Sequence, residues 1–257
     1  MTKIENFAKL NQSNEILHVG NVWDVQSALM FEKQNYRVLG TSSLAIANSL
    51  GYEDGENMSF EELFEVVKAI IQKVSIPLSV DLEAGYGNDI DTIIKNIISL
   101  IDIGVVGINI EDSIIENNNR IIVDANKFAQ TIKSIKSYLI KNKINIFLNI
   151  RTDFYIMGLT NPLEETLKRI KIYENVGADG IFVPCIVDVQ DIKEVVKSTS
   201  LPVNIMTMPN LPSFDTLEKI GIKRVSQGPF IYNDMIKKLE NTIKNIKDNN
   251  SFKGLFK

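Results

Sequence analysis

The chain is poor in features that define whole classes of protein. Its 257 residues contain one cysteine, Cys185, which excludes an intramolecular disulfide framework and suits a reducing cytoplasm. No uncharged apolar run is long enough to span a bilayer, and the amino terminus lacks the apolar core of a signal peptide. The formal net charge of −4 gives no attraction to nucleic acid or to an anionic membrane surface. We therefore expect a cytoplasmic protein that binds neither nucleic acid nor membrane.

The chain also lacks a Gly-x-Gly-x-x-Gly fingerprint after any predicted strand, which disfavours an open doubly wound sheet, the alternative fold. What it does contain is eight short apolar runs alternating with stretches of helical periodicity. The runs are too far apart for hairpins and do not alternate apolar with polar residues, as is typical of buried parallel strands. They cover residues 16–22, 37–41, 77–83, 107–112, 144–150, 180–184, 202–206 and 223–227. We predict an α/β fold, a single (β/α)8 TIM barrel domain of parallel strands over residues 1–257.

Charged side chains follow three consecutive predicted strands. Asp81 and Glu83 end the third strand, and because strand residues i and i+2 point to the same face, we expect them to project together. Two carboxylates 4 Å apart repel by roughly 4 kcal/mol at an effective dielectric of about 20, so a cation or a shared proton is expected nearby. Glu111 and Asp112 end the fourth strand, and Arg151 ends the fifth. In a barrel these ends share the face that carries active sites, so we predict one common pocket.

The residue types in this predicted pocket indicate its chemistry. Asp81, Glu83 and Glu111 are hard oxygen donors without histidine or cysteine beside them, which favours Mg²⁺, or Mn²⁺ as an alternative, over zinc. Arg151 offers a rigid fork for a carboxylate or phosphoryl oxygen, and residues 42–44 place backbone N–H groups at a helix start. The predicted ligand is a small polyanion, a 2-oxo acid or an enol. A cation beside its 2-oxo oxygen would stabilise an enolate.

Two further residues allow more than one interpretation. His18, the only histidine, lies in the first apolar run and is expected to pack in the core or line the barrel rather than act as a base. Tyr86 lies between two glycines and is either a pocket donor or an anchor of the loop. Gly85 is expected to let the backbone turn tightly and approach a ligand.

The order and spacing of these motifs resemble the isocitrate lyase / phosphoenolpyruvate mutase superfamily over nearly the whole chain. The matching stretches are residues 21–24, 41–43, 50–54, 81–87, 108–112, 151–153, 177–180 and 202–206. The resemblance implies a barrel, a Mg²⁺ site and cleavage or rearrangement of a C–C or P–C bond next to a 2-oxo acid. It also implies a tetramer whose last helices swap between neighbouring subunits. We therefore expect a homo-oligomer, a dimer or a tetramer.

Carried over by position, the resemblance gives individual residues their roles. Asp81 is the expected principal metal ligand, with Glu83 and Glu111 in the water shell of the metal. Asp54 lies beside the metal and, with Glu111 and Arg151, is expected to take part in catalysis. The expected substrate contacts are Ser42, Ser43, Leu44, Gly85, Arg151 and Asn204.

Segment 113–123 departs from the family pattern. Family lyases acting on isocitrate or methylisocitrate carry a cysteine there that serves as an acid, whereas this chain has a polar loop with three asparagines at 117–119, Arg120 and no cysteine. We therefore expect a branch resembling the mutases, and a Mg²⁺-dependent lyase that cleaves a C–C bond next to a 2-oxo or 2-hydroxy carboxylate, a decarboxylase or a lyase forming a 2-oxo acid. The alternatives are a mutase or hydrolase acting on the P–C bond of a phosphonate, and a non-catalytic barrel that binds a metabolite.

Overall fold

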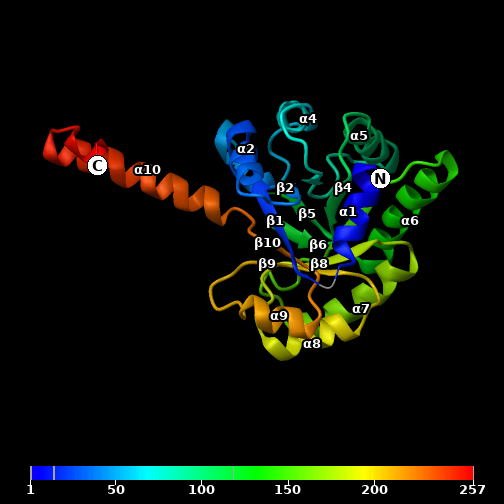
Figure 1. Cartoon of the computed structure of the whole chain (residues 1–257). Coiled ribbons are helices and arrows are strands. Elements are labelled where there is room, and N and C mark those ends of the chain that lie inside the picture. The colour runs from blue at the N-terminus through cyan, green and yellow to red at the C-terminus, as the bar shows by residue number, and fades with distance from the viewer. Residues whose placement is uncertain (1, 14, 118, 257) are drawn as a thin grey trace.

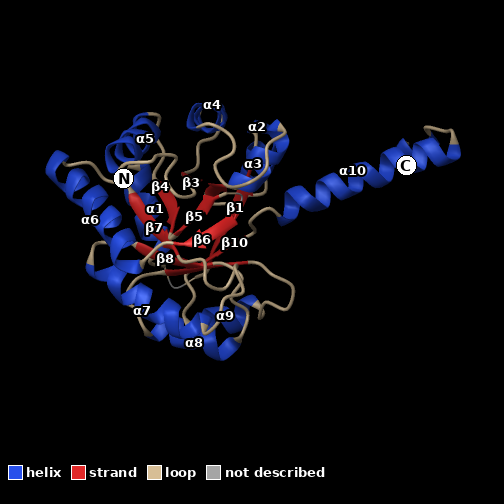
Figure 2. Ribbon diagram, turned by 180° about the vertical axis from the view of Figure 1, so that it is seen from behind, coloured by secondary structure: helices blue, strands red, loops and turns tan. Residues whose placement is uncertain are grey.

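The computed structural model describes residues 2–13, 15–117 and 119–256, so residue 118 and both ends of the predicted 1–257 domain lie outside it. Within these ranges, eight parallel strands close into a barrel surrounded by helices (Figure 2), which confirms the predicted TIM barrel. The barrel strands are β1 (Leu17–Val22), β2 (Leu39–Thr41), β3 (Leu78–Asp81), β4 (Gly107–Glu111), β7 (Phe147–Arg151), β8 (Gly180–Val183), β9 (Val203–Met206) and β10 (Arg224–Ser226). Their order around the barrel is their order along the chain.

Most of the helices begin at capping residues and cover the strands with one apolar face. In α4, for example, Ser59 and Glu62 form a capping box, and Leu63, Val67 and Ile70 face the core at helical spacing. The helices are α1 (Lys3–Asn11), α2 (Val25–Lys33), α3 (Ser43–Leu50), α4 (Phe60–Ile71), α5 (Ile90–Asp102), α6 (Ala125–Asn142), α7 (Pro162–Asn175), α8 (Val189–Lys197), α9 (Phe214–Ile220), α10 (Phe230–Asn249) and the 3₁₀ turn η1 (Lys253–Leu255).

Helix α1 closes the amino-terminal end of the barrel. Its side chain Phe7 is fully buried and meets Phe147 edge-on, with 5.5 Å between ring centroids. A side chain at Gly107 would collide with Phe7, because a Cβ atom there would lie 2.9 Å from the ring. The barrel is therefore plugged at one end, and its other end is left for a ligand.

The segment predicted as a polar loop, residues 113–123, is instead an antiparallel β-hairpin of β5 (Ser113–Glu116) and β6 (Asn119–Ile122). The prediction was wrong because paired isoleucines in this segment, such as Ile114 opposite Ile121, favour strand pairing over an open loop. Ile115 packs against Gly55, where a Cβ atom would lie 2.6 Å from Ile115, so the hairpin rests on the loop before α4.

Helix α10 extends away from the barrel in both views (Figures 1 and 2). Among its residues only Tyr232 is buried, where it meets Trp23 edge-on, while Leu239 and Ile243 are more than half exposed. None of the helices in the described ranges combines the length and apolar character needed to cross a membrane. His18, expected in the core or barrel lining, is instead exposed and stacks on Phe214 with 4.4 Å between ring centroids.

Candidate active site

A small cavity of about 120 Å³ opens at the carboxyl ends of the barrel strands. Strands β2, β3, β4 and β7 are neighbours in the barrel, so their ends bring together residues far apart in the sequence. Six residues predicted for the site line this cavity: Ser42, Ser43, Leu44, Asp54, Asp81 and Arg151. The volume is several times the ~10–15 Å³ that a cavity needs to hold one water molecule, so the cavity has room for a small ligand.

Ser43 connects the two carboxylates nearest to helix α3. Its hydroxyl donates to Asp81 Oδ2 at 2.8 Å and lies 3.5 Å from Asp54 Oδ1. The other oxygen of Asp81, Oδ1, is buried and has no hydrogen-bond partner among the described residues. Helix α3 begins at Ser43, and its first backbone N–H groups have no acceptor within the helix, so they can bind an anion beside Asp81.

On the opposite side, two arginines hold the carboxylate of Glu111. Arg151 Nη1 lies 2.9 Å from Glu111 Oε2, and Arg151 also donates to both oxygens of Asp153, from Nε at 2.5 Å and from Nη2 at 3.2 Å. Arg120 of the hairpin reaches Glu111 Oε1, Ser113 Oγ at 2.7 Å and Asp153 Oδ2 at 3.3 Å. The hairpin thus contributes a second cation to the cluster of carboxylates.

Asp112 points the other way, because adjacent strand residues face opposite sides of the sheet. Its carboxylate is fully buried behind the barrel and accepts bonds from Arg169 Nη1 at 2.9 Å and Tyr173 Oη at 2.8 Å. Its other oxygen accepts the backbone N–H of Asp153 at 2.9 Å. Asp112 therefore supports the segment that carries Asp153 and does not line the pocket that the sequence predicted for it.

The turn after β3 orients Glu83 differently from the sequence prediction, which placed it on the same strand face as Asp81. Strand β3 ends at Asp81, and Glu83 has a left-handed backbone with φ of 48°, so the two carboxylates do not share a strand face. Asn96 of α5 fixes this turn by donating its amide to the carbonyls of Gly85 and Tyr86. Gly85 has φ of 116°, and a Cβ atom there would lie 2.9 Å from Ile93, so the close approach is to α5.

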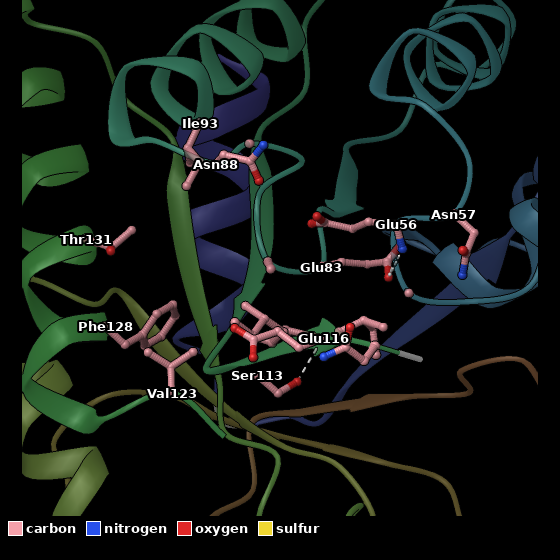
Figure 3. A pocket seen from close by; sticks show the side chains of 17 residues that line it. Glu56, Asn57, Glu83, Asn88, Ile93, Ser113, Glu116, Val123, Phe128 and Thr131 are labelled. Atoms are coloured by element: carbon pink, nitrogen blue, oxygen red, sulfur yellow. Dashed lines mark hydrogen bonds between the residues drawn. The ribbon is translucent and has the colours of Figure 1, made fainter. Parts of the chain in front are cut away.

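A second and larger cavity, of about 640 Å³, lies beside the first. Figure 3 shows Glu56 and Glu83 on one wall of it and Phe128 and Val123 on the other. Glu111 and Ser113 also line this larger cavity, whereas Asp54 lines the small one. Arg120 pairs with Asp54 of the small cavity and with Glu111 of the large one. Its guanidinium therefore lies between the two cavities.

Burial and mutual repulsion raise the pKa values of three carboxyl groups. Burial, followed by the charge of Asp54, raises the pKa of Glu83 to about 8. Burial raises the pKa of Glu111 to about 8, and the charge of Arg151 opposes the rise. Burial and the nearby charge of Asp81 raise the pKa of Asp54. The carboxylates of this site are therefore close enough to repel one another.

These pKa values predict how pH affects the protein without metal. Between about pH 4.5 and pH 8 the unfolded chain loses protons that folded Glu83 and Glu111 retain, so stability falls as pH rises, by at most ~1.4 kcal/mol per pH unit for each group. A divalent cation held by these carboxylates would require them deprotonated, so its stabilising effect would grow over the same range. Melting temperatures with chelator and with excess Mg²⁺ measure this difference. The Glu83→Gln variant should show a flatter profile, and a Mg²⁺ effect independent of pH would contradict the assignment.

The donor set fits a hydrated divalent cation. Asp81 Oδ1 is a buried carboxylate oxygen without a partner in the part of the chain that the structure describes, which is costly unless a cation or a proton reaches it. Over residues 2–13, 15–117 and 119–256, no three acidic, histidine or cysteine side chains lie in a preformed metal cluster. Mg²⁺ needs only one or two carboxylates because it keeps several waters, so Asp81 with more distant acids suits it.

Two predicted substrate contacts do not line either cavity, and two residues that line the larger cavity were not predicted. Asn204, predicted as a substrate contact, lies on β9 two residues before Met206, which lines the small cavity, so Asn204 lies deeper in the barrel. Both polar atoms of its side chain are buried and lack partners in the described parts of the chain. Roles for Asn204 and Gly85 in substrate binding stay predictions. Glu56 and Ser113 were missed, because a lone acid after a glycine and a serine after two acids carry no distinguishing pattern.

The fold and site together define a class: (β/α)8-barrel proteins that gather carboxylates and an arginine around a small anion-sized cavity at the carboxyl ends of the strands. The chain belongs to the phosphoenolpyruvate phosphomutase family, whose sequence model matches residues 7–247, and thus to the PEP mutase/isocitrate lyase superfamily.

Three relatives illustrate this similarity. The chain is 32% identical over 212 residues to the uncharacterised protein Rv1998c of Mycobacterium tuberculosis H37Rv, covering 82% of this chain and 77% of the relative. It is 27% identical over 241 residues to the oxaloacetate decarboxylase of Pseudomonas entomophila, covering 90% and 80% of the two chains. A solved structure from Burkholderia cenocepacia J2315, described as a "putative phosphonomutase", is 31% identical with a TM-score of 0.87, covering 94% of this chain and 99% of that one.

Proposed function

We propose that this protein is a Mg²⁺-dependent lyase that breaks a C–C bond next to the 2-oxo or 2-hydroxy group of a small carboxylate. The observation that carries the proposal is the 120 Å³ cavity, in which Asp81, Arg151 and the start of α3 face one small volume. Within the described ranges, Asp81 Oδ1 has no hydrogen-bond partner. The 27% identity to an oxaloacetate decarboxylase supports the same reaction class. A hairpin without cysteine argues against the acid that the isocitrate-cleaving lyases use.

Asp81, with Glu83, Glu111 and Asp54 around it, would hold the cation, and Mn²⁺ would bind the same oxygen donors. When bound, such a cation supplies a Lewis acid that stabilises negative charge developing on the 2-oxo oxygen of the substrate.

The chain's own residues would bind and orient the substrate. Arg151 donates two of its five N–H groups to Asp153, which fixes the guanidinium plane and leaves N–H groups on the cavity side for a substrate oxygen. The backbone N–H groups at the start of α3, at Ser43 and Leu44, would hold the carboxylate of the substrate. The hairpin bearing Arg120 covers the carboxylates from one side and would keep water away from the reacting carbon.

A substrate panel tests this proposal. Oxaloacetate, 2-methylisocitrate and phosphonopyruvate, each with Mg²⁺, should separate the reaction classes when pyruvate, phosphate and phosphoenolpyruvate are all measured. We expect Mg²⁺-dependent release of a 2-oxo acid from at least one carboxylate substrate, and its loss with chelator. Formation of phosphate or phosphoenolpyruvate from phosphonopyruvate, with no turnover of the other substrates, would contradict the C–C lyase and support the alternative reaction. No turnover of any substrate, together with tight metabolite binding, would favour a non-catalytic barrel.

Cleavage or rearrangement of a P–C bond is the second candidate function. Arg120 favours it, because a second guanidinium at the site could bind the oxygens of a phosphoryl group. The 31% identity to a structure described as a "putative phosphonomutase" also supports it.

We further propose that the protein works in the cytoplasm as a homo-oligomer, a dimer or tetramer, in which α10 packs on a neighbouring subunit. The exposed apolar side chains of this helix support the proposal, since Leu239 and Ile243 would otherwise face water. Light scattering should give the mass of two or four chains, and a monomer at micromolar concentration would contradict it.

A further inference from the structure

The carboxylate of Glu83 is held by two donors that come from different segments. The hydroxyl of Tyr86 donates to Glu83 Oε1 at 2.6 Å, and the backbone N–H of Glu56 donates to Oε2 at 3.0 Å. Because each carboxylate oxygen can accept two hydrogen bonds, one acceptor position on each oxygen is left for a water or a ligand. Two donors on two oxygens fix the plane of a carboxylate that a long glutamate side chain would otherwise let rotate.

The two residues that supply these donors are also bonded to each other, through different atoms. The backbone N–H of Tyr86 donates to Glu56 Oε1 at 2.8 Å, so the loop that bears Glu56 and the turn that bears Tyr86 hold one another. The same loop carries Asp54 two residues earlier. This pair of bonds, which we call the Glu56–Tyr86 brace, therefore links the segments that carry Asp54 and Glu83. Figure 3 shows Glu56 and Glu83 side by side.

The turn that forms the brace is conformationally costly. Glu83 and Tyr86 adopt left-handed backbones with φ of 48° and 54°, which residues with side chains rarely do. Such conformations cost on the order of 1–3 kcal/mol each and persist only where the surroundings enforce them. Here the enforcing contacts are the amide of Asn96 and the carboxylate of Glu56. The structure thus maintains a strained turn whose visible result is the orientation of Glu83.

We propose that Tyr86 and Glu56 are positioning residues that set the carboxylate of Glu83 for a divalent cation. They contact Glu83 and each other, and neither lines the small cavity where the substrate would bind. The inference rests on the proposed function only in requiring that a divalent cation binds at this site. It assigns Tyr86 a role beyond anchoring the loop.

Mn²⁺ binding to the resting protein, measured by titration without substrate, tests the proposal. The Tyr86→Phe variant removes only the hydroxyl. It keeps the aromatic ring, whose centroid lies 6.3 Å from the ring centroid of Phe60. We expect Mn²⁺ affinity to fall about 10–100-fold, which is the usual loss when a residue that hydrogen-bonds to a metal ligand is removed. The matched control is Tyr155→Phe. In the wild type the Tyr155 hydroxyl donates to Asp191 at 2.8 Å, so this variant also loses one hydroxyl, and its Mn²⁺ affinity should equal that of the wild type.

A double-mutant cycle separates positioning from a general structural effect. In a Glu83→Gln background, Tyr86→Phe should weaken Mn²⁺ binding little further, because it acts through the missing carboxylate. An equal loss in both backgrounds would overturn the proposal. Glu56→Ala provides a second test, with an expected loss of at least about 10-fold. Wild-type affinity in both single variants refutes this inference alone, whereas a wild-type protein that binds no Mn²⁺ refutes the proposed function as well.

Discussion

An Asp81→Asn variant should lose at least ~100-fold in Mn²⁺ affinity and at least ~1,000-fold in turnover. Loss of a residue that only hydrogen-bonds to a metal ligand typically lowers metal affinity or activity about 10–100-fold, and we expect loss of a direct ligand to lower them further. Asp81 is the acid whose Oδ1 is buried with no partner among the residues described above, and Ser43 donates to its other oxygen. Calorimetric titration with Mn²⁺ and a steady-state assay measure the two effects.

The same substitution should leave the metal-free protein at least as stable as the wild type. The charge of Asp81 raises the pKa values of Asp54 and Glu83, so removing it relieves repulsion between buried groups. Asp102→Asn, at the exposed end of α5, is the control and should change neither metal affinity nor turnover. Wild-type Mn²⁺ affinity in Asp81→Asn would contradict the assignment of Asp81 as the principal metal ligand.

An Arg169→Met variant should destabilise the protein by about 3–5 kcal/mol, because it leaves the fully buried Asp112 without its cation. For a chain of this size the melting temperature should fall by about 2–4 °C per kcal/mol. Arg169 also donates to the carbonyl of Val123 at 3.0 Å and lies over the ring of Phe154, so the loss spreads to two segments. Equilibrium urea unfolding is the direct measurement.

Two controls distinguish loss of the ion pair from loss of packing. Lys168→Met changes the neighbouring residue, whose ammonium pairs with Glu164 and Glu165 in solvent, and should cost less than about 1 kcal/mol. Adding Asp112→Asn to Arg169→Met should recover part of the lost stability, because no uncompensated charge then remains buried. An Arg169→Met protein as stable as Lys168→Met would show that the pair is not needed.

The barrel could be predicted because its signals are local and repeated. Each strand is an apolar run flanked by helix periodicity, and the observed strands fall within or one residue from the predicted runs. Helix α1 was not predicted, although Thr2 and Glu5 form a capping box that marks its start. The hairpin was also missed, because its polar turn residues obscure two short strands, and the contact of Ile115 with Gly55 is not visible in the sequence.

The site could be predicted only to the level of which strand ends carry charged residues. The parallel topology brings Asp81, Glu111 and Arg151 to one end of the barrel whatever the exact turns are. Sequence alone does not show that Asp112 faces a buried arginine 57 residues later, since that depends on packing between β4 and α7. It likewise does not show Glu56 beside Glu83, because a left-handed turn creates that contact.

The most direct test of the metal-site account is a crystal structure with Mn²⁺ and oxalate, a small dicarboxylate that imitates an enolate. We predict an anomalous difference peak in contact with Asp81 Oδ1, with oxalate between the metal, Arg151 and the start of α3. A peak elsewhere, or none while oxalate occupies the cavity, would contradict the central claim that these acids hold a divalent cation against an anionic substrate.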